Sequence, residues 1–132
     1  MRANKFVRMG IVGLMAGSLF AAAPAAMAQG GGARVSNQGS CSGAADWKLS
    51  LKPEDGGKIQ MEFEVEHAKP GQTWAVRITD NGTQVFKGSR TANSLHKFKV
   101  KKLINDRAGS DAVKATATNN TTGQVCNGSV TL

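Results

Sequence analysis

The stretch 96–102, HKFKVKK, carries three lysines that alternate with apolar residues. Side chains spaced two apart lie on one face of a β-strand, so these lysines can bind an anion or pair with acids on a neighbouring strand. Residues 58–67 present three glutamates at the same spacing. If the two strands are antiparallel neighbours, opposite charges face each other, and each pair contributes about 0.2–1 kcal/mol. We therefore expect Glu64 opposite Lys99, and a structural role for the lysines.

Four other basic residues form the candidate binding site: Arg77, Lys87, Arg90 and Lys114. They lie on or beside strands that are expected to be neighbours, with threonines around them and no acidic residue close by. A basic surface of this kind favours acidic partners, such as an anionic cell-envelope polymer. The alternative is that the four charges are dispersed over a solvated face with no ligand.

The residues that could perform catalysis or hold a metal are few. His67 and His96 lie at strand ends, and neither has a cysteine or carboxylate at ligand spacing, so we expect no metal and no cofactor. A triad of His67, Asp111 and a serine is conceivable, but the Gly-x-Ser-x-Gly nucleophile motif is missing from the sequence. Residues 105–111, NDRAGSD, lack the dense alternating acids of a calcium loop and are interpreted as a turn. The sequence indicates a protein that is not an enzyme.

Aromatic residues also limit the possible ligands. The sequence has no tyrosine, and Trp47 and Trp74 alternate with the residues expected to face the core. Phe86 is then the one candidate for an exposed ring. Modules that bind single-stranded nucleic acid or sugars usually expose rings on which the ligand stacks, so this pattern argues against nucleic acid as a partner.

The first residues have the features of an export signal. A basic start with Arg2, Lys5 and Arg8 precedes an apolar run and the sequence AMA, which predicts a signal peptide over residues 1–28 that is cleaved after Ala28. The remainder carries 14 Lys and Arg against 9 Asp and Glu, a net charge of +5, because three basic residues belong to the signal. We expect a secreted protein whose mature form has no membrane span.

Two cysteines, Cys41 and Cys126, lie near the two ends of the predicted mature chain. In an exported protein with this count, a single disulfide is the simplest pairing. Such a bridge closes a loop of almost the whole domain, and loop entropy then accounts for up to about 4–5 kcal/mol.

Period-two alternation between turn residues predicts an all-β domain over residues 41–132, preceded by a flexible, Gly-rich lead-in over residues 29–40. The seven predicted strands are 47–52, 58–67, 73–79, 83–91, 96–104, 112–118 and 124–132. We expect a seven-stranded antiparallel two-sheet sandwich of the immunoglobulin or fibronectin type III kind, with the first, second and fifth strands in one sheet. A closed barrel is the alternative.

The spaced pattern C…DW…W…DNGT…C, from Cys41 to Cys126, resembles that of small exported actinomycete proteins of unassigned function. That resemblance implies a fold and a compartment, and no activity. The loop 119–123, NNTTG, is similar to the Asn-Pro-Thr-Thr-Gly loop of chagasin-like cysteine-protease inhibitors. Here Asn120 replaces the proline, and the other motifs of that family are missing. The size and predicted export also resemble the neocarzinostatin-like apoproteins, which carry two disulfides.

Two functions remain as expectations. The first is a secreted, non-catalytic sandwich domain that binds an anionic envelope polymer or an extracellular protein through its basic residues. The second is a secreted protease inhibitor that acts through an exposed loop, either 119–123 or 90–95.

Overall fold

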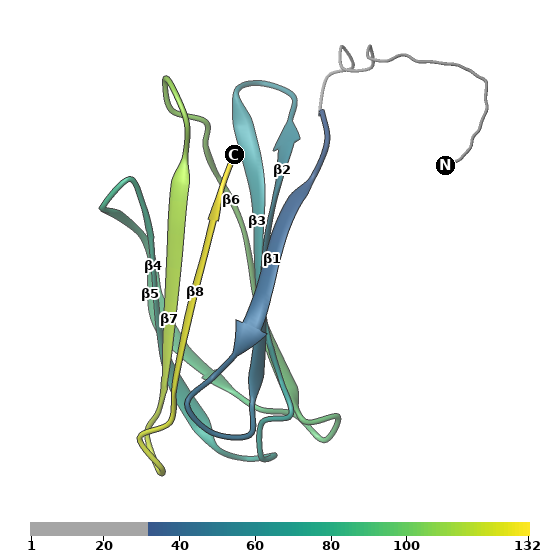
Figure 1. Cartoon of the computed structure of the whole chain (residues 1–132), viewed down its shortest axis with the longest axis vertical. Coiled ribbons are helices and arrows are strands. Elements are labelled where there is room, and N and C mark those ends of the chain that lie inside the picture. The colour runs from purple at the N-terminus through teal and green to yellow at the C-terminus, as the bar shows by residue number, and fades with distance from the viewer. Residues whose placement is uncertain (1–31) are drawn as a thin grey trace, which may run out of the picture. The chain divides into compact units, whose positions relative to one another are not determined.

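The computed structural model describes residues 32–132, which fold into an all-β domain of eight strands and no helix (Figure 1). The strands are β1 Val35–Ser40, β2 Asp46–Glu54, β3 Lys58–Glu66, β4 Thr73–Asp80, β5 Thr83–Thr91, β6 Lys97–Asn105, β7 Ala112–Asn119 and β8 Val125–Thr131. No helix in residues 32–132 is long and apolar enough to cross a bilayer. The predicted signal peptide, residues 1–28, lies outside the described residues.

The strand count corrects the sequence-based prediction of seven. The additional strand, β1, occupies residues 35–40, which were predicted to be part of a flexible lead-in. It pairs antiparallel with β2, from Val35 opposite Leu51 to Ser40 opposite Asp46. The sequence did not indicate this strand because most of its side chains are exposed, so it lacks the alternation of buried and exposed residues. It is an edge strand held mainly by backbone pairing with β2.

The strands form two antiparallel sheets, in the orders β1-β2-β3-β6 and β5-β4-β7-β8 (Figure 1). The predicted grouping of the other seven strands is confirmed, and the two separate sheets exclude a closed barrel. The β4–β5 hairpin turns at Asn81 and Gly82, whose φ angles are 50° and 84°. Asn-Gly accepts positive φ in a two-residue hairpin, as the sequence predicted.

The core lies between the sheets and takes every second residue of the central strands. Along β3 the side chains of Ile59, Met61, Phe63 and Val65 are fully buried. Both tryptophans belong to this core, as predicted. Trp47 lies so close to Gly39 and Gly128 that a Cβ at Gly128 would come within 2.7 Å of its ring, so β1 and β8 need glycine where they approach Trp47.

The lysine stripe on β6 pairs with the acids of β3. Glu64 lies opposite Lys99 in the register, as expected. The side chains pair diagonally, with Lys99 Nζ 2.9 Å from Glu62 and Lys97 Nζ 3.8 Å from Glu64. The ion pair with Glu62 raises the pKa of Lys99, and the hydrogen bond from Lys99 lowers the pKa of Glu62. These lysines therefore stabilise the sheet, and the protein itself neutralises much of their charge.

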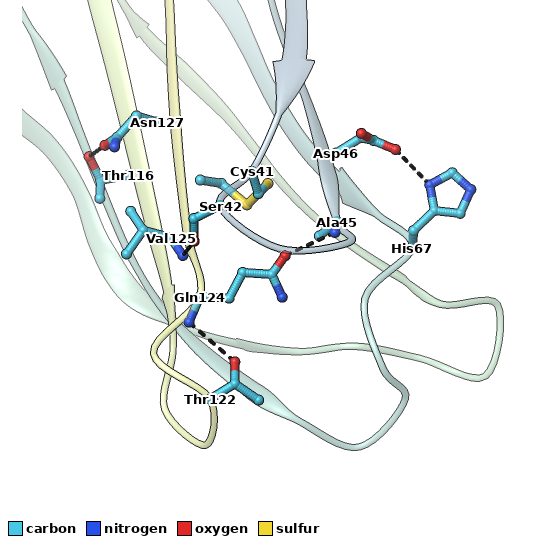
Figure 2. Close-up of a disulfide and its surroundings, with 11 residues drawn as sticks. Cys41, Ser42, Ala45, Asp46, His67, Thr116, Thr122, Gln124, Val125 and Asn127 are labelled. Carbon is cyan, nitrogen blue, oxygen red and sulfur yellow. Dashed lines mark hydrogen bonds and ion pairs between the residues drawn. A yellow bond between two sulfur atoms is a disulfide. The ribbon is translucent and has the colours of Figure 1, made fainter.

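The disulfide joins Cys41, just after β1, to Cys126 in β8, and so links the two sheets (Figure 2). Beside it, the Val125 backbone N–H donates to Ser42 Oγ at 2.9 Å, and the Ala45 N–H donates to Gln124 Oε1 at 2.9 Å. These contacts connect segments about 80 residues apart in sequence, at separations of 83 and 79. The disulfide and these bonds close the β1–β8 side of the sandwich.

We expect the double variant Cys41→Ser/Cys126→Ser to lose about 3–4 kcal/mol of unfolding free energy, because the 85-residue separation makes the closed loop long. Urea denaturation followed by tryptophan fluorescence measures this loss. The wild-type protein under reducing conditions serves as a control and should unfold at the same urea concentration as the variant. A loss below about 1 kcal/mol would show that the hydrogen bonds around the bridge hold this side by themselves.

Candidate functional site

Three of the four predicted site residues lie together on the outer surface of the sheet β5-β4-β7-β8. Arg77 of β4, Lys87 of β5 and Lys114 of β7 are exposed, and they line one shallow depression with a volume of about 560 Å³. We call this surface the basic face. Apart from the buried Val76, the other residues that line it are small or hydroxylated: Ala75, Thr79, Gly88, Ser89, Thr116 and Thr118.

Strand alternation and register place these cations. On β4, burial of Val76 and Ile78 in the core forces Arg77 outward. Arg77 is directly opposite Lys87 on one side and Thr116 on the other. Lys114 lies two residues from Thr116 along β7, so it is diagonal to Arg77. Lys87, Arg77 and Lys114 thus form a row of cations, one on each of three adjacent strands, which we call the cation row.

No acidic side chain balances the cation row. Across β4, β5, β7 and β8 the only acidic residue is Asp80, which is fully buried. Like charges directly opposite each other destabilise a sheet, typically by a few tenths of a kcal/mol, and Arg77 and Lys87 form such a pair. The outer surface of the other sheet differs, because Glu62 and Glu64 lie within 4.0 Å of lysines there.

Arg77 is partly held in place by a neighbour. Its Nε donates a hydrogen bond to Gln84 Oε1 at 3.0 Å, and Gln84 belongs to the adjacent strand β5. Within residues 32–132 its two terminal nitrogens make no hydrogen bond to the protein. Gln84 therefore orients the guanidinium group through Nε, and the N–H groups of the two terminal nitrogens remain available to a ligand.

Arg90 does not belong to the basic face, contrary to the sequence-based grouping. It lies opposite Trp74 in the register, so its side chain leaves the other side of β5. Its Nε donates to the Lys99 backbone carbonyl at 3.3 Å, and its guanidinium carbon lies 5.0 Å from the centre of the Phe86 ring. Arg90 thus bridges β5 and β6, and Phe86 is partly buried rather than freely exposed.

The two histidines lie at the end of the domain that carries the disulfide. His67 Nδ1 is 2.8 Å from Asp46 Oδ2 (Figure 2). Asp111 lies at the opposite end, where its backbone bonds to that of Leu132. A triad of His67 and Asp111 is therefore geometrically impossible. The pair with Asp46 was missed because Asp46 lies just before the predicted strand 47–52, whereas β2 begins at Asp46.

A carboxyl cluster at the end opposite the disulfide also escaped the sequence analysis. It consists of Asp80, Asp106 and Asp111. Asp80 is fully buried, and its carboxylate oxygens have no hydrogen-bond partner within residues 32–132; Arg107 Nε lies 3.6 Å from one of them. Burial, followed by the neighbouring Asp80 carboxyl, raises the pKa of Asp111. The neighbouring Asp111 carboxyl raises the pKa of Asp106. In the described part of the chain, no group of three His, Cys, Asp or Glu side chains is arranged to hold a metal ion.

The raised pKa values of this cluster predict a pH-dependent stability. A carboxyl group whose pKa is raised by folding contributes its full stabilisation at pH values below its ordinary pKa of 3.8. This contribution to the unfolding free energy is lost as the pH rises through the raised pKa. We expect Asp111→Asn to raise the unfolding free energy at pH 7 relative to wild type, with the gain shrinking toward pH 3.5. Urea denaturation across this range measures it. Asp55→Asn, in an exposed turn, is the control. An equal gain at all pH values would contradict the role of the cluster.

Comparisons with known proteins add no relative to these observations. No family model matches the chain, and neither a curated protein nor a solved structure matches it. The function is therefore inferred from the geometry and charge of the domain itself.

Proposed function

We propose that this protein is a secreted, non-catalytic binding domain that captures an anionic polymer of the cell envelope or the medium through its basic face. The observation that carries the proposal is the cation row. Arg77, Lys87 and Lys114 occupy three adjacent strands, and the sheet offers them no exposed carboxylate. A polyanion supplies the missing negative charge and gains from three contacts at once.

The contrast between the two sheets supports a binding role for the second. On the first sheet, Lys97 and Lys99 form ion pairs with the glutamates of β3. On the second sheet the same folding constraints leave Arg77 and Lys87 opposite each other. An arrangement that lowers the stability of the free protein, and that a bound anion would relieve, is typical of a functional surface.

Secretion and the finer fold type belong to the same proposal. The disulfide is consistent with an oxidising compartment outside the cytoplasm, and the predicted signal peptide would direct the chain there. The strand orders β1-β2-β3-β6 and β5-β4-β7-β8 support an immunoglobulin-like sandwich. Such domains often bind partners on a sheet face or at their end loops.

The rigidity of the β7–β8 loop favours protease inhibition as a second candidate function. Buried Asn119 accepts hydrogen bonds at Oδ1 from the backbone N–H groups of Thr121 and Thr122, at 2.8 and 3.1 Å. Its Nδ2 donates to Gln72 Oε1 at 2.8 Å. In the other candidate loop, Asn93 Oδ1 similarly accepts from the Leu95 N–H, and Leu95 is 71% exposed. Preorganised loops lose little entropy on binding.

For the leading function, we expect the purified protein to sediment with isolated anionic cell envelopes at low salt and to dissociate as salt rises. Arg77→Gln/Lys114→Gln should bind roughly tenfold more weakly, because each exposed ionic contact contributes about 0.5–1 kcal/mol. The salt slope should fall by about two, one for each lost contact. Lys69→Gln/Lys101→Gln removes the same charge elsewhere and is the matched control. Equal losses in both variants would show that only net charge matters.

For the second candidate, we expect inhibition of an extracellular cysteine or serine protease that changes little with salt. Asn119→Ala should weaken it, since the loop loses the acceptor that holds two backbone N–H groups. Residual activity of a panel of proteases gives the measurement, and Arg77→Gln/Lys114→Gln is the control that should inhibit like wild type. A panel with no inhibited member removes this candidate.

A further inference from the structure

The cation row has a direction. Lys87 and Arg77 are directly opposed on neighbouring strands, and Lys114 is one diagonal step beyond Arg77. Directly opposite Cβ atoms are about 5 Å apart and diagonal ones about 7 Å. The three charges therefore follow one another across β5, β4 and β7 rather than along any single strand. A ligand that contacts all three must cross these strands and carry closely spaced charges.

We propose that the ligand of the basic face is a linear polymer with a phosphate group in every repeat, and that it lies across β5, β4 and β7 along the cation row. This inference rests on the proposed polyanion-binding function and specifies the ligand chemistry. A linear polymer can contact all three cations of the row at once within the open depression.

The donors of the basic face fit a tetrahedral phosphate better than a planar carboxylate. Gln84 holds the Nε side of Arg77, so the paired terminal nitrogens remain as a fork for two oxygens of one anion. Lys87 and Lys114 act as point charges on either side. Adjacent strands thus approach each anion from different directions, and a phosphate has oxygens outside a single plane to meet them, whereas a carboxylate has two in one plane.

Hydroxyl groups beside the cation row can complete the contacts. Thr79 and Thr118 of β4 and β7 line the depression with Ser89 of β5, and none of the three makes a side-chain hydrogen bond within residues 32–132. Thr116, in contrast, donates to Asn127 Oδ1 at 3.1 Å. Free hydroxyls donate readily to the oxygens of a phosphate, and they allow the polymer to lie close to the sheet.

Nucleic acid is the phosphate polymer that this surface fits least. Proteins that bind single strands stack bases on aromatic side chains. In the described residues the aromatic side chains are buried or partly buried, and none lines the depression on the basic face. A phosphate polymer without bases, in which the backbone itself carries all the recognition, matches a surface of cations and hydroxyls.

The test measures affinity against chain length and anion type with the full purified protein. The probes are orthophosphate, tripolyphosphate, long-chain inorganic polyphosphate, poly-glutamate and single-stranded DNA, the last three matched in charge number. Calorimetry at 50 and 150 mM salt gives each dissociation constant. We expect tripolyphosphate to bind about a hundredfold more tightly than orthophosphate, because linked contacts multiply through effective concentration. Long polyphosphate should bind about tenfold more tightly than poly-glutamate.

Two variants locate the polymer. Lys87→Gln removes the charge at one end of the cation row. It should therefore reduce the gain in affinity for tripolyphosphate over orthophosphate by about tenfold. Lys69 lies in an exposed loop outside the cation row, so Lys69→Gln should leave this gain in affinity unchanged. Backbone chemical-shift changes on adding tripolyphosphate should follow β5, β4 and β7 across the sheet. If Lys87→Gln and Lys69→Gln showed the same gain in affinity for tripolyphosphate over orthophosphate, the proposed binding along the cation row would be wrong.

The outcomes separate this inference from the function on which it rests. Equal or tighter binding of poly-glutamate would reject phosphate and leave a general polyanion-binding domain. Tighter binding of DNA than of polyphosphate would also reject it, in favour of a nucleic-acid ligand. No binding of any probe, together with no sedimentation with envelopes, would reject the polyanion-binding function itself.

Discussion

Burial of one face of each sheet against the other is the constraint on which the rest of the domain depends. Fully buried side chains such as Phe63, Ile78 and Trp74 occupy alternate positions along their strands. Because the period is two, a register slip of a single residue would expose this whole set and bury its charged neighbours. Once the core residues are placed inside, their neighbours along the strand, such as Arg77 on β4 and Lys99 on β6, must lie on an outer face.

The two outer faces meet this constraint in different ways. On the first sheet, β3 presents acids between lysine-bearing strands, and contacts such as Lys99–Glu62 neutralise the charge within the protein. On the second sheet the same alternation leaves Arg77 and Lys87 opposite each other without an acid. The domain thus has one surface on which lysines pair with glutamates and another on which the cations have no acidic neighbour, and this asymmetry underlies the proposed function.

The fold was largely predictable because its signals are local. Alternation and turn residues identified seven strands. The expected sandwich topology made β3 and β6 neighbours, and the facing of their acids and lysines followed from that topology. The missed strand, β1, has little alternation and is held by backbone pairing with β2. Arg90 was wrongly grouped with Lys87, because it follows Lys87 by three residues in a regular part of β5, and this spacing places the two side chains on opposite faces.

The sequence by itself determined the residues that face the core, the disulfide partners and the opposition of Glu64 to Lys99, since each depends on period-two spacing or on the number of cysteines. Only the tertiary structure decided which distant side chains meet. The sequence already grouped the three residues of the cation row, but the separation of Arg90 from them, the contact of Asp46 with His67 and the carboxyl cluster around Asp80 came from the structure. Contacts between such segments depend on how the sheets pack and on where the loops end, and local sequence patterns carry no information about either.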